Sequence, residues 1–345
     1  MRANDVKIGL GIRGAAAGER DDGVPAIGAA LGPEIALLSV VGLWASTFII
    51  TKDLYDTLTP LAFTGARFSL MIVFSWSVLL VQARRRGTLA SAVRVKRSDL
   101  PRFLLAGVTG YTLYQLGFAL GLDRTSPFSS ALLIAMVPVV TVVLLAALGE
   151  RTPRIAWIGL AVAVAGAIVF LIDKRGDGGG TVTGDVLSLG AAFAFATYGV
   201  VNRPLTKAYS PATATAYAVT LGGVPLLAIC APAMTDQDWG AVGAWQWFAI
   251  AYMVILPVYV AYMLWNWAIA RRGVAAATRF SLLVPVVSGL LSAIVFSEAF
   301  GPVKLLGGGI VLLGLAIARR RGDPPPLKAT NVSSGGGMTD GSVQR

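Results

Sequence analysis

Residues 127–172 read PFSSALLIAMVPVVTVVLLAALGERTPRIAWIGLAVAVAGAIVFLI. All charged residues of this stretch fall within one short break, GERTPR (149–154). On either side of the break, an apolar run of about 20 residues is long enough, as a helix, to cross roughly 30 Å of hydrocarbon. A helix can span lipid because it satisfies its own backbone hydrogen bonds. The stretch therefore predicts a hairpin of two membrane-spanning helices.

The composition of the whole chain points to lipid as its solvent. Hydrophobic residues make up 55% of the 345 and charged residues only 14%, whereas about a quarter of a soluble domain is charged. The net charge of +11 is spread between the apolar runs and forms no basic domain, so no nucleic-acid partner is expected. We expect a lipid bilayer around this protein.

Apolar runs that can cross a bilayer occur ten times along the chain. The fold class predicted from them is an all-α polytopic membrane protein with ten transmembrane helices. Residues 1–33 are Gly/Ala-rich and residues 321–345 are Pro/Gly/Ser-rich, so both are expected to be disordered tails. The expected spans are 35–51, 61–82, 102–122, 128–148, 155–172, 185–202, 212–232, 245–269, 276–297 and 303–318.

The positions of the basic residues predict the orientation of these spans. With ten spans, 22 of the 29 Lys and Arg residues fall on the side of the two termini. Cytoplasmic loops carry an excess of this kind, so we expect a multi-pass protein of the cell (inner) membrane with both termini cytoplasmic. Five basic residues fall on the opposite side, namely Lys52, Arg124, Lys174, Arg175 and Lys304.

The two halves of the chain share landmarks in the same order. WASTFIITK (44–52) aligns with FATYGVVNR (195–203), and the same offset superposes Thr59-Pro60 on Ser210-Pro211. Each half has five expected spans, an odd number, so the second half enters the membrane inverted. Inverted repeats of this kind place a binding site near the midplane between them. The predicted organisation is a first repeat at 34–173, an external linker loop at 174–184 and a second repeat at 185–320.

Several motifs make residues 34–320 similar to the EamA family of the drug/metabolite transporter superfamily. They are LWAST (43–47) followed by Lys52, Arg67 in the second span, and the series Pro138, Gly149-Glu150-Arg151, Gly159 and Ala165-Gly166. Ser297-Glu298-Ala299 departs from this series at the matching point of the second half. The resemblance implies a ten-helix inner-membrane carrier of amino acids, other metabolites or drugs, often an exporter. It does not select one substrate.

Four charged residues lie in or beside the expected spans. Arg67 is about two turns into the second span, and we expect its guanidinium to reach the membrane face. Arg279, about one turn into the ninth span, has two explanations: it reaches the membrane face, or it borders a cavity and attracts a carboxylate. Glu150 and Glu298 stand at hairpin turns, where each is expected to cap the next helix.

Uncharged polar and aromatic residues recur on one face of several spans. Tyr114 and Gln115 in the third span, and Tyr262 and Asn266 in the eighth, predict inward faces, because an amide facing lipid would stay unsatisfied. Interfacial belts or contacts between helices are the alternative, which we prefer for the tryptophans that flank Asn266. The candidate substrate-binding residues are Trp44, Thr47, Tyr114, Gln115, Tyr198, Tyr262, Asn266 and Arg279.

Two prolines occupy matching positions in the two halves. Pro138 lies within the fourth span and Pro285 within the ninth. Each removes a backbone hydrogen bond and interrupts its helix. Freed carbonyl groups at membrane depth are tolerated where they face protein or a water-filled cavity, and paired interruptions are typical of the midplane sites of repeat transporters. We expect both prolines to mark helix breaks near the site.

The residue types that are missing limit the chemistry. The chain has no His and one Cys, Cys230, and no Asp or Glu falls in the middle of an expected span. No catalytic residue, metal or cofactor is expected, and facilitated transport or exchange is favoured over proton coupling. A polytopic membrane enzyme and a non-transporting structural or receptor protein are the alternatives. We favour a transporter that moves a small-molecule substrate, more often outward, by alternating access, as a monomer or homodimer.

Overall fold

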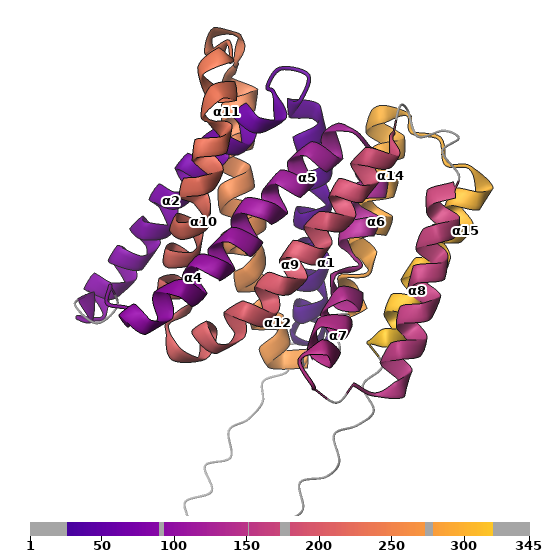
Figure 1. Ribbon diagram of the computed structural model, residues 1–345, viewed down its shortest axis with the longest axis horizontal. Helices are drawn as coiled ribbons and strands as arrows, with labels where there is room; N and C mark the ends of the chain where they lie inside the picture. The colour runs from indigo at the N-terminus through magenta and orange to yellow at the C-terminus, as the bar shows by residue number, and fades with distance from the viewer. Residues whose placement is uncertain (1–25, 90–92, 151, 173–179, 273–278, 320–345) are drawn as a thin grey trace, which may run out of the picture.

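The computed structural model describes residues 26–89, 93–150, 152–172, 180–272 and 279–319, and the regular elements in these ranges are all helices (Figure 1). The first half contains α1 (Ala26–Leu54), α2 (Pro60–Arg85), η1 (Arg97–Asp99), α4 (Leu100–Gly107), η2 (Val108–Leu113), α5 (Tyr114–Asp123), α6 (Pro127–Ile134), α7 (Val137–Ala147) and α8 (Arg154–Ile172). The second half contains α9 (Val182–Ala208), α10 (Pro211–Asp236), η3 (Trp239–Ala241), α11 (Ala244–Val254), η4 (Ile255–Val260), α12 (Ala261–Arg272), α14 (Leu283–Phe296) and α15 (Pro302–Ala318).

Most of the expected spans appear as long apolar helices. In the described part of the chain, eight helical segments are long and apolar enough to cross a membrane, and they match the first eight expected spans. The last two expected spans appear as shorter apolar helices, α14 with 14 residues and α15 with 17. Residues 276–278, at the start of the ninth expected span, lie outside the described ranges.

Two predicted boundaries differ from the structure. The sequence predicts a disordered tail up to residue 33, but α1 begins at Ala26. AIGAAL (26–31) contains no charged residue and no proline, so nothing in it interrupts a helix. Similarly, α9 begins at Val182, inside the predicted linker. The rest of the expected tails, residues 1–25 and 321–345, and residues 174–179 of the linker lie outside the described ranges.

Equivalent helices of the two halves begin with the same chemistry. The hydroxyl of Thr59 accepts a hydrogen bond from the backbone N–H of Ala62 at the start of α2, and that of Ser210 accepts one from Thr213 at the start of α10. A proline follows each cap, at a position where its missing N–H costs nothing. The aligned Thr-Pro and Ser-Pro pairs therefore start equivalent helices.

The packing of the helices has a twofold pattern. Two pairs join equivalent helices, α2 with α10 and α8 with α15. The other main contacts occur in exchanged pairs: α1 with α12 matches α9 with α5, and α1 with α14 matches α9 with α6 and α7. Exchanging the two halves thus maps the contacts onto one another, as in the self-complementary interface of a twofold dimer.

Equivalent helices run antiparallel. A Cβ added to Gly159 of α8 would lie 2.3 Å from the backbone nitrogen of Ala318 in α15, and one added to Gly314 would lie 2.3 Å from that of Ala163. These pairs follow opposite orders along the two helices. The absence of side chains lets the backbones approach closely, which is how apolar helices associate in lipid. In the α2–α10 pair, the indole nitrogen of Trp76 donates a hydrogen bond to the hydroxyl of Thr220 at 2.8 Å.

The third and eighth spans each contain a π-helical segment at matching positions. Val108–Leu113 (η2) separates α4 from α5, and Ile255–Val260 (η4) separates α11 from α12. π-helical segments are rare in proteins, and those that occur are often found at functional sites. Each segment carries a tyrosine whose ring packs against α2: Tyr111 contacts Phe68, and Tyr259 contacts Phe74.

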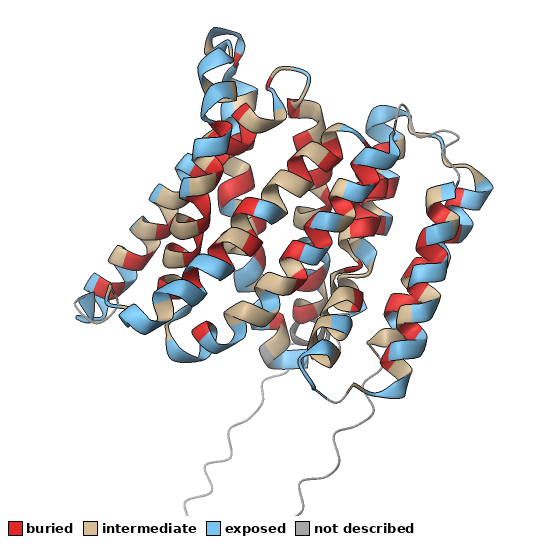
Figure 2. Ribbon diagram, in the orientation of Figure 1, coloured by how far each residue is buried: buried red, intermediate tan, exposed pale blue. Residues whose placement is uncertain are grey.

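The outer surface of the bundle is apolar. Buried residues concentrate on the helix faces that meet inside, whereas the outward faces are exposed (Figure 2). On α8 and α15 the exposed positions include Ile168, Leu306 and Leu313, each more than half exposed. Such a surface is suited to lipid.

Candidate functional site

Trp44 of α1 connects the first helix to the eighth span. Its indole nitrogen donates a hydrogen bond to the carbonyl oxygen of Pro257 in η4 at 3.1 Å. Its ring packs against Trp265 and Tyr262 of α12, with centroid distances of 5.3 and 5.8 Å. A tryptophan inside a membrane protein needs a partner for its N–H, and here the π-helical segment supplies the acceptor.

A second group of aromatic residues joins the third span to α9. Phe195 packs against Tyr114 at 4.8 Å and against Tyr198 at 5.5 Å between ring centroids. Tyr198 also packs against Tyr111 of η2 at 5.6 Å and accepts a hydrogen bond from the side-chain nitrogen of Asn202 at 3.1 Å. We call this group, together with Trp44, Tyr262 and Trp265, the aromatic cluster.

Tyr262 relates the two parts of the aromatic cluster. Its ring packs on Trp44, and it interacts electrostatically with Tyr114 and Tyr198. Even so, 46% of the surface of this residue is exposed. Tyr262 therefore lies at the edge of the aromatic cluster and is not enclosed by it. Asn266 is also exposed and stands one turn later on the same face of α12.

Arg67 is buried in the interior of the bundle, with 8% of its surface exposed. Its Nη2 atom donates a hydrogen bond to the side-chain oxygen of Gln115 on α5. The rings of Phe63 and Phe68 lie 5.3 and 5.5 Å from its guanidinium carbon. The expectation that Arg67 extends to the membrane face is therefore wrong, because these neighbours hold the side chain between α2 and α5.

The other sequence-predicted residues occupy different surroundings. The hydroxyl of Thr47 donates to the carbonyl of Trp44 at 2.6 Å, so it is engaged by its own helix. Arg279 is exposed on the surface ahead of α14. Pro138 stands in the first turn of α7, after an interruption at residues 135–136, and Pro285 stands in the first turn of α14, after a turn at residues 281–282.

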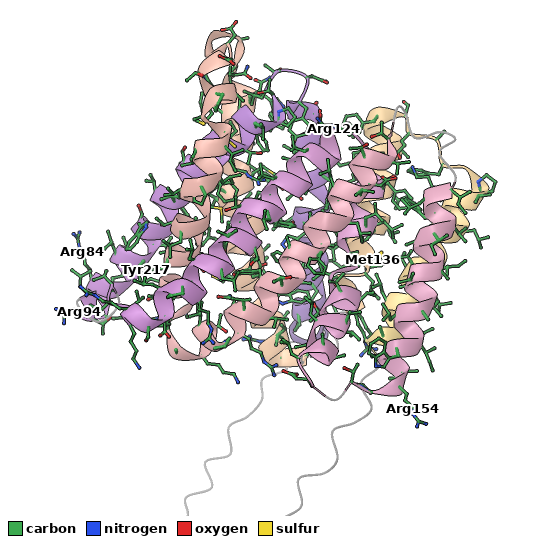
Figure 3. The ribbon with its side chains drawn as sticks, viewed as in Figure 1. Arg84, Arg94, Arg124, Met136, Arg154 and Tyr217 are labelled. Atoms are coloured by element: carbon green, nitrogen blue, oxygen red, sulfur yellow. The ribbon has the colours of Figure 1, made fainter. Side chains whose placement is uncertain are left out.

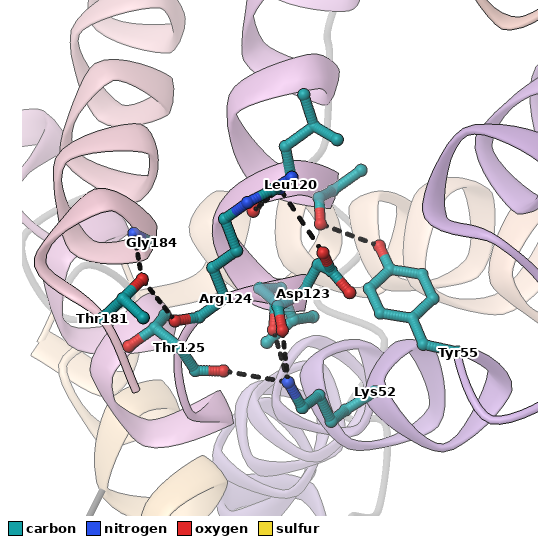
Figure 4. A network of polar contacts seen from close by, with 10 residues as sticks. Lys52, Tyr55, Leu120, Asp123, Arg124, Thr125, Thr181 and Gly184 are labelled. Atoms are coloured by element: carbon teal, nitrogen blue, oxygen red, sulfur yellow. Dashed lines mark hydrogen bonds and ion pairs between the residues drawn. The ribbon is translucent and has the colours of Figure 1, made fainter. Parts of the chain in front are cut away.

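A polar network closes one end of the bundle. The Nζ atom of Lys52, in the last turn of α1, donates hydrogen bonds to the carbonyl oxygens of Leu122, Asp123 and Thr125 at 2.9, 2.9 and 3.2 Å (Figure 4). The hydroxyl of Thr125 continues the network to Asp185 of α9 at 2.7 Å. These bonds join α1, the turn between α5 and α6, and α9, which belongs to the other half.

Glu298 and Lys304 form a buried ion pair close to this network. Oε1 of Glu298 and Nζ of Lys304 are 3.1 Å apart, and Ser292 donates to the other carboxylate oxygen. Glu298 lies within electrostatic reach of Lys52, and burial raises the pKa of its carboxyl. The expectation that Glu298 caps α15 is wrong, since Gly301 stands at that cap and no side chain bonds there.

A matching pair of charges lies at the opposite end of the bundle. Arg203 donates to Glu150 at 2.9 Å, with both side chains more than half exposed. In the alignment of the two halves Arg203 corresponds to Lys52, and Glu150 corresponds to Glu298. Arg203 thus joins α9 to the last hairpin of the first repeat, whereas Lys52 bonds to the turn between α5 and α6 of its own repeat and interacts electrostatically with Glu298 of the other.

Sequence reasoning missed the burial of Arg67, the Glu298–Lys304 pair and the π-helical segments. A signal existed for Arg67, because Phe63 stands four residues earlier and therefore on the same face of the helix. For Lys304, the cue was its place in an apolar helix only six residues after an acid. Pro257 marks η4, whereas η2 carries no proline.

The apolar outer surface, the long helices and the paired halves define a multi-pass helical membrane protein. The EamA-like transporter family model matches it twice, at residues 32–172 and 182–320. This chain belongs to the EamA-like transporter family.

Named relatives are transporters. The chain is 31% identical to a probable terminal-alkyne amino-acid exporter of Streptantibioticus cattleyicolor, with 83% of this chain and 93% of the relative covered. It is 25% identical to an uncharacterized transporter of Archaeoglobus fulgidus, over 83% and 98% of the two chains. The uncharacterized inner membrane transporter YedA of Escherichia coli is 22% identical, over 82% and 89%. A solved crystal structure shares the fold, with a TM-score of 0.56, 22% identity and coverage of 83% and 96%.

Proposed function

We propose that this protein carries a small metabolite across the cell membrane by alternating access, with ten spans arranged as two inverted repeats. The observation that carries the proposal is the symmetry of the two ends. The Lys52 and Glu298 groups at one end and Arg203 and Glu150 at the other occupy equivalent positions. Two equivalent closures at opposite ends are what a carrier needs to open one side at a time.

The two closures differ in strength, which supports a resting state closed at the Lys52 end. Lys52 makes three hydrogen bonds there, and the buried Glu298–Lys304 pair lies beside it. The Arg203–Glu150 pair is exposed, and exposed pairs contribute on the order of 0–1 kcal/mol. Tyr262 and Asn266, both exposed, then border the opening through which a substrate enters.

The distribution of basic residues supports an orientation with the Lys52 end outside. Arg94 and Arg154 project from the lower part of the view and Arg124 from the upper end (Figure 3). Most basic residues outside the spans belong to loops on the side of Arg154, and cytoplasmic loops carry this excess. Both termini are then cytoplasmic, and the site opens toward the cytoplasm at rest.

We propose amino acids as the substrate class and export as the direction. The support is the relative named as a probable terminal-alkyne amino-acid exporter, which aligns over most of both chains. The aromatic cluster suits a cargo with a compact apolar or unsaturated side chain.

Transport into everted membrane vesicles tests this proposal. Everted vesicles expose the cytoplasmic face, so an exporter accumulates labelled substrate inside them. We expect uptake of labelled L-phenylalanine, L-leucine or L-propargylglycine above that of vesicles without the protein. Preloading with unlabelled substrate is expected to speed the uptake if the carrier exchanges. Equal uptake with and without the protein for all three compounds would reject amino acids as its substrates.

A further inference from the structure

Arg67 is a buried cation without a carboxylate partner among the described residues. Salt bridges in the described ranges involve other side chains, and the groups that interact electrostatically with Arg67 are the hydroxyls of Tyr55 and Tyr114. Taking an ion out of water is costly unless an opposite charge or hydrogen bonds compensate. The neighbouring phenyl rings and one amide supply only part of that compensation.

The hydrogen-bonding capacity of the guanidinium is incompletely used. An arginine has five N–H donors, and here Nη2 bonds to Gln115. Its Nε atom is buried and has no acceptor in the part of the chain that the structure describes. Buried donors in proteins nearly always have a partner, so an unpaired one on a charged group indicates a ligand that completes it.

Arg67 lies next to the aromatic cluster. Gln115, its hydrogen-bond acceptor, is the neighbour of Tyr114 on α5, and Tyr114 lies within electrostatic reach of both Arg67 and Tyr262. An anion held at Arg67 would therefore leave the rest of its molecule against the rings of the cluster. At the position that matches Arg67, the second half has Ala218, which is buried. The proposed site therefore has a cation from the first half only.

We infer that Arg67 binds the carboxylate of the transported molecule and that Gln115 positions the guanidinium for it. This inference rests on the proposed function and names the recognition group of its site. A planar carboxylate matches the two parallel N–H bonds that an arginine offers. The cargo is thus a monocarboxylate with a compact apolar or aromatic body, and its carboxylate is the group that the carrier requires.

Competition by analogues of one compound tests the chemistry of recognition. Labelled L-phenylalanine is transported into proteoliposomes in the presence of 3-phenylpropionate, which keeps the carboxylate, or of phenylalaninamide or phenethylamine, which lack it. We expect competition by 3-phenylpropionate alone. Competition by phenethylamine with none by 3-phenylpropionate overturns the carboxylate assignment and leaves the transporter proposal intact. If the wild-type protein does not transport phenylalanine, both the carboxylate assignment and the transporter proposal are rejected.

Variants of Arg67 and Gln115 test the residues. Arg67→Gln is expected to raise the half-saturation concentration for L-phenylalanine at least about tenfold, since removing one side of a desolvated charge pair has effects of this order or larger. Arg67→Lys keeps the charge but lacks the two parallel N–H donors of a guanidinium, so the half-saturation concentration is expected to rise less. Arg84→Gln, at the exposed end of the same helix, is the matched control and is expected to transport normally.

Gln115→Glu separates a ligand-binding role from a structural one. The new carboxylate would pair with Arg67, so the protein is expected to be at least as heat-stable as the wild type while its transport falls at least tenfold. If Arg67 only packs the helices, this variant would be stable and fully active, which overturns the inference. Normal transport by Arg67→Gln, or loss in Arg279→Gln instead, overturns it as well.

Discussion

The ammonium group of Lys304 lies 3.1 Å from the carboxylate of Glu298, and the two side chains are 0% and 4% exposed. Removing one partner of a buried pair leaves an uncompensated charge, which costs about 3–5 kcal/mol. We expect Lys304→Met to destabilise the protein by about this amount, and Lys304→Met with Glu298→Gln to recover most of it. Thermal unfolding in detergent measures both. Equal melting temperatures for wild type and Lys304→Met would show that the pair contributes nothing to stability.

Substitutions on one helix test the packing of α8 against α15. A Cβ on Gly314 would lie 2.3 Å from the backbone of Ala163, whereas one on Gly309, in the same helix, meets nothing within 4 Å. We expect Gly314→Ala to lower stability by about 1–3 kcal/mol through overpacking. Gly309→Ala is expected to be neutral or slightly stabilising, because Ala is the better helix former. Similar melting temperatures for the two variants would contradict the close approach of the backbones.

The hydrogen bond from Trp44 to the carbonyl of Pro257 links α1 to a π-helical segment of the other half. Trp44→Phe keeps an aromatic ring but removes the donor and leaves a buried carbonyl, which costs about 1–3 kcal/mol. We expect the transport rate to fall several-fold while the protein still inserts and folds. Trp267→Phe, on the exposed side of α12, serves as the control. Unchanged transport in Trp44→Phe would mean that this bond is dispensable for the cycle.

Long apolar runs made most of the fold predictable. Hydropathy alone located the first eight spans, since lipid requires a run of fixed length whatever the tertiary contacts are. The hairpin at residues 149–153 and the Thr-Pro and Ser-Pro helix starts depend on local chemistry, so the sequence revealed them. The π-helical segments were not predictable in this way, because η2 has no residue that signals a wider turn.

The candidate site was predictable only in part. Spacing placed Tyr114 and Gln115 on an inward face, and the structure puts Tyr114 in the aromatic cluster and Gln115 beside Arg67. The burial of Arg67 depends on a helix 48 residues further along the chain, which no local pattern reveals. The same holds for Glu298, whose partners come together only when α14 and α15 pack.

Accessibility of Asn266 from each side of the membrane tests alternating access most directly. The chain has one cysteine, the buried Cys230, so Cys230→Ser with Asn266→Cys carries a single thiol at the proposed opening. With a membrane-impermeant thiol reagent, we predict fast labelling in everted vesicles and slow labelling in intact cells. Adding Lys52→Gln, which weakens the outer closure, is predicted to raise labelling in intact cells. Ile168→Cys, 56% exposed on the outer surface of α8, is the control and should not respond to Lys52→Gln. Labelling of Asn266→Cys that is the same from both sides and unaffected by Lys52→Gln would contradict the account.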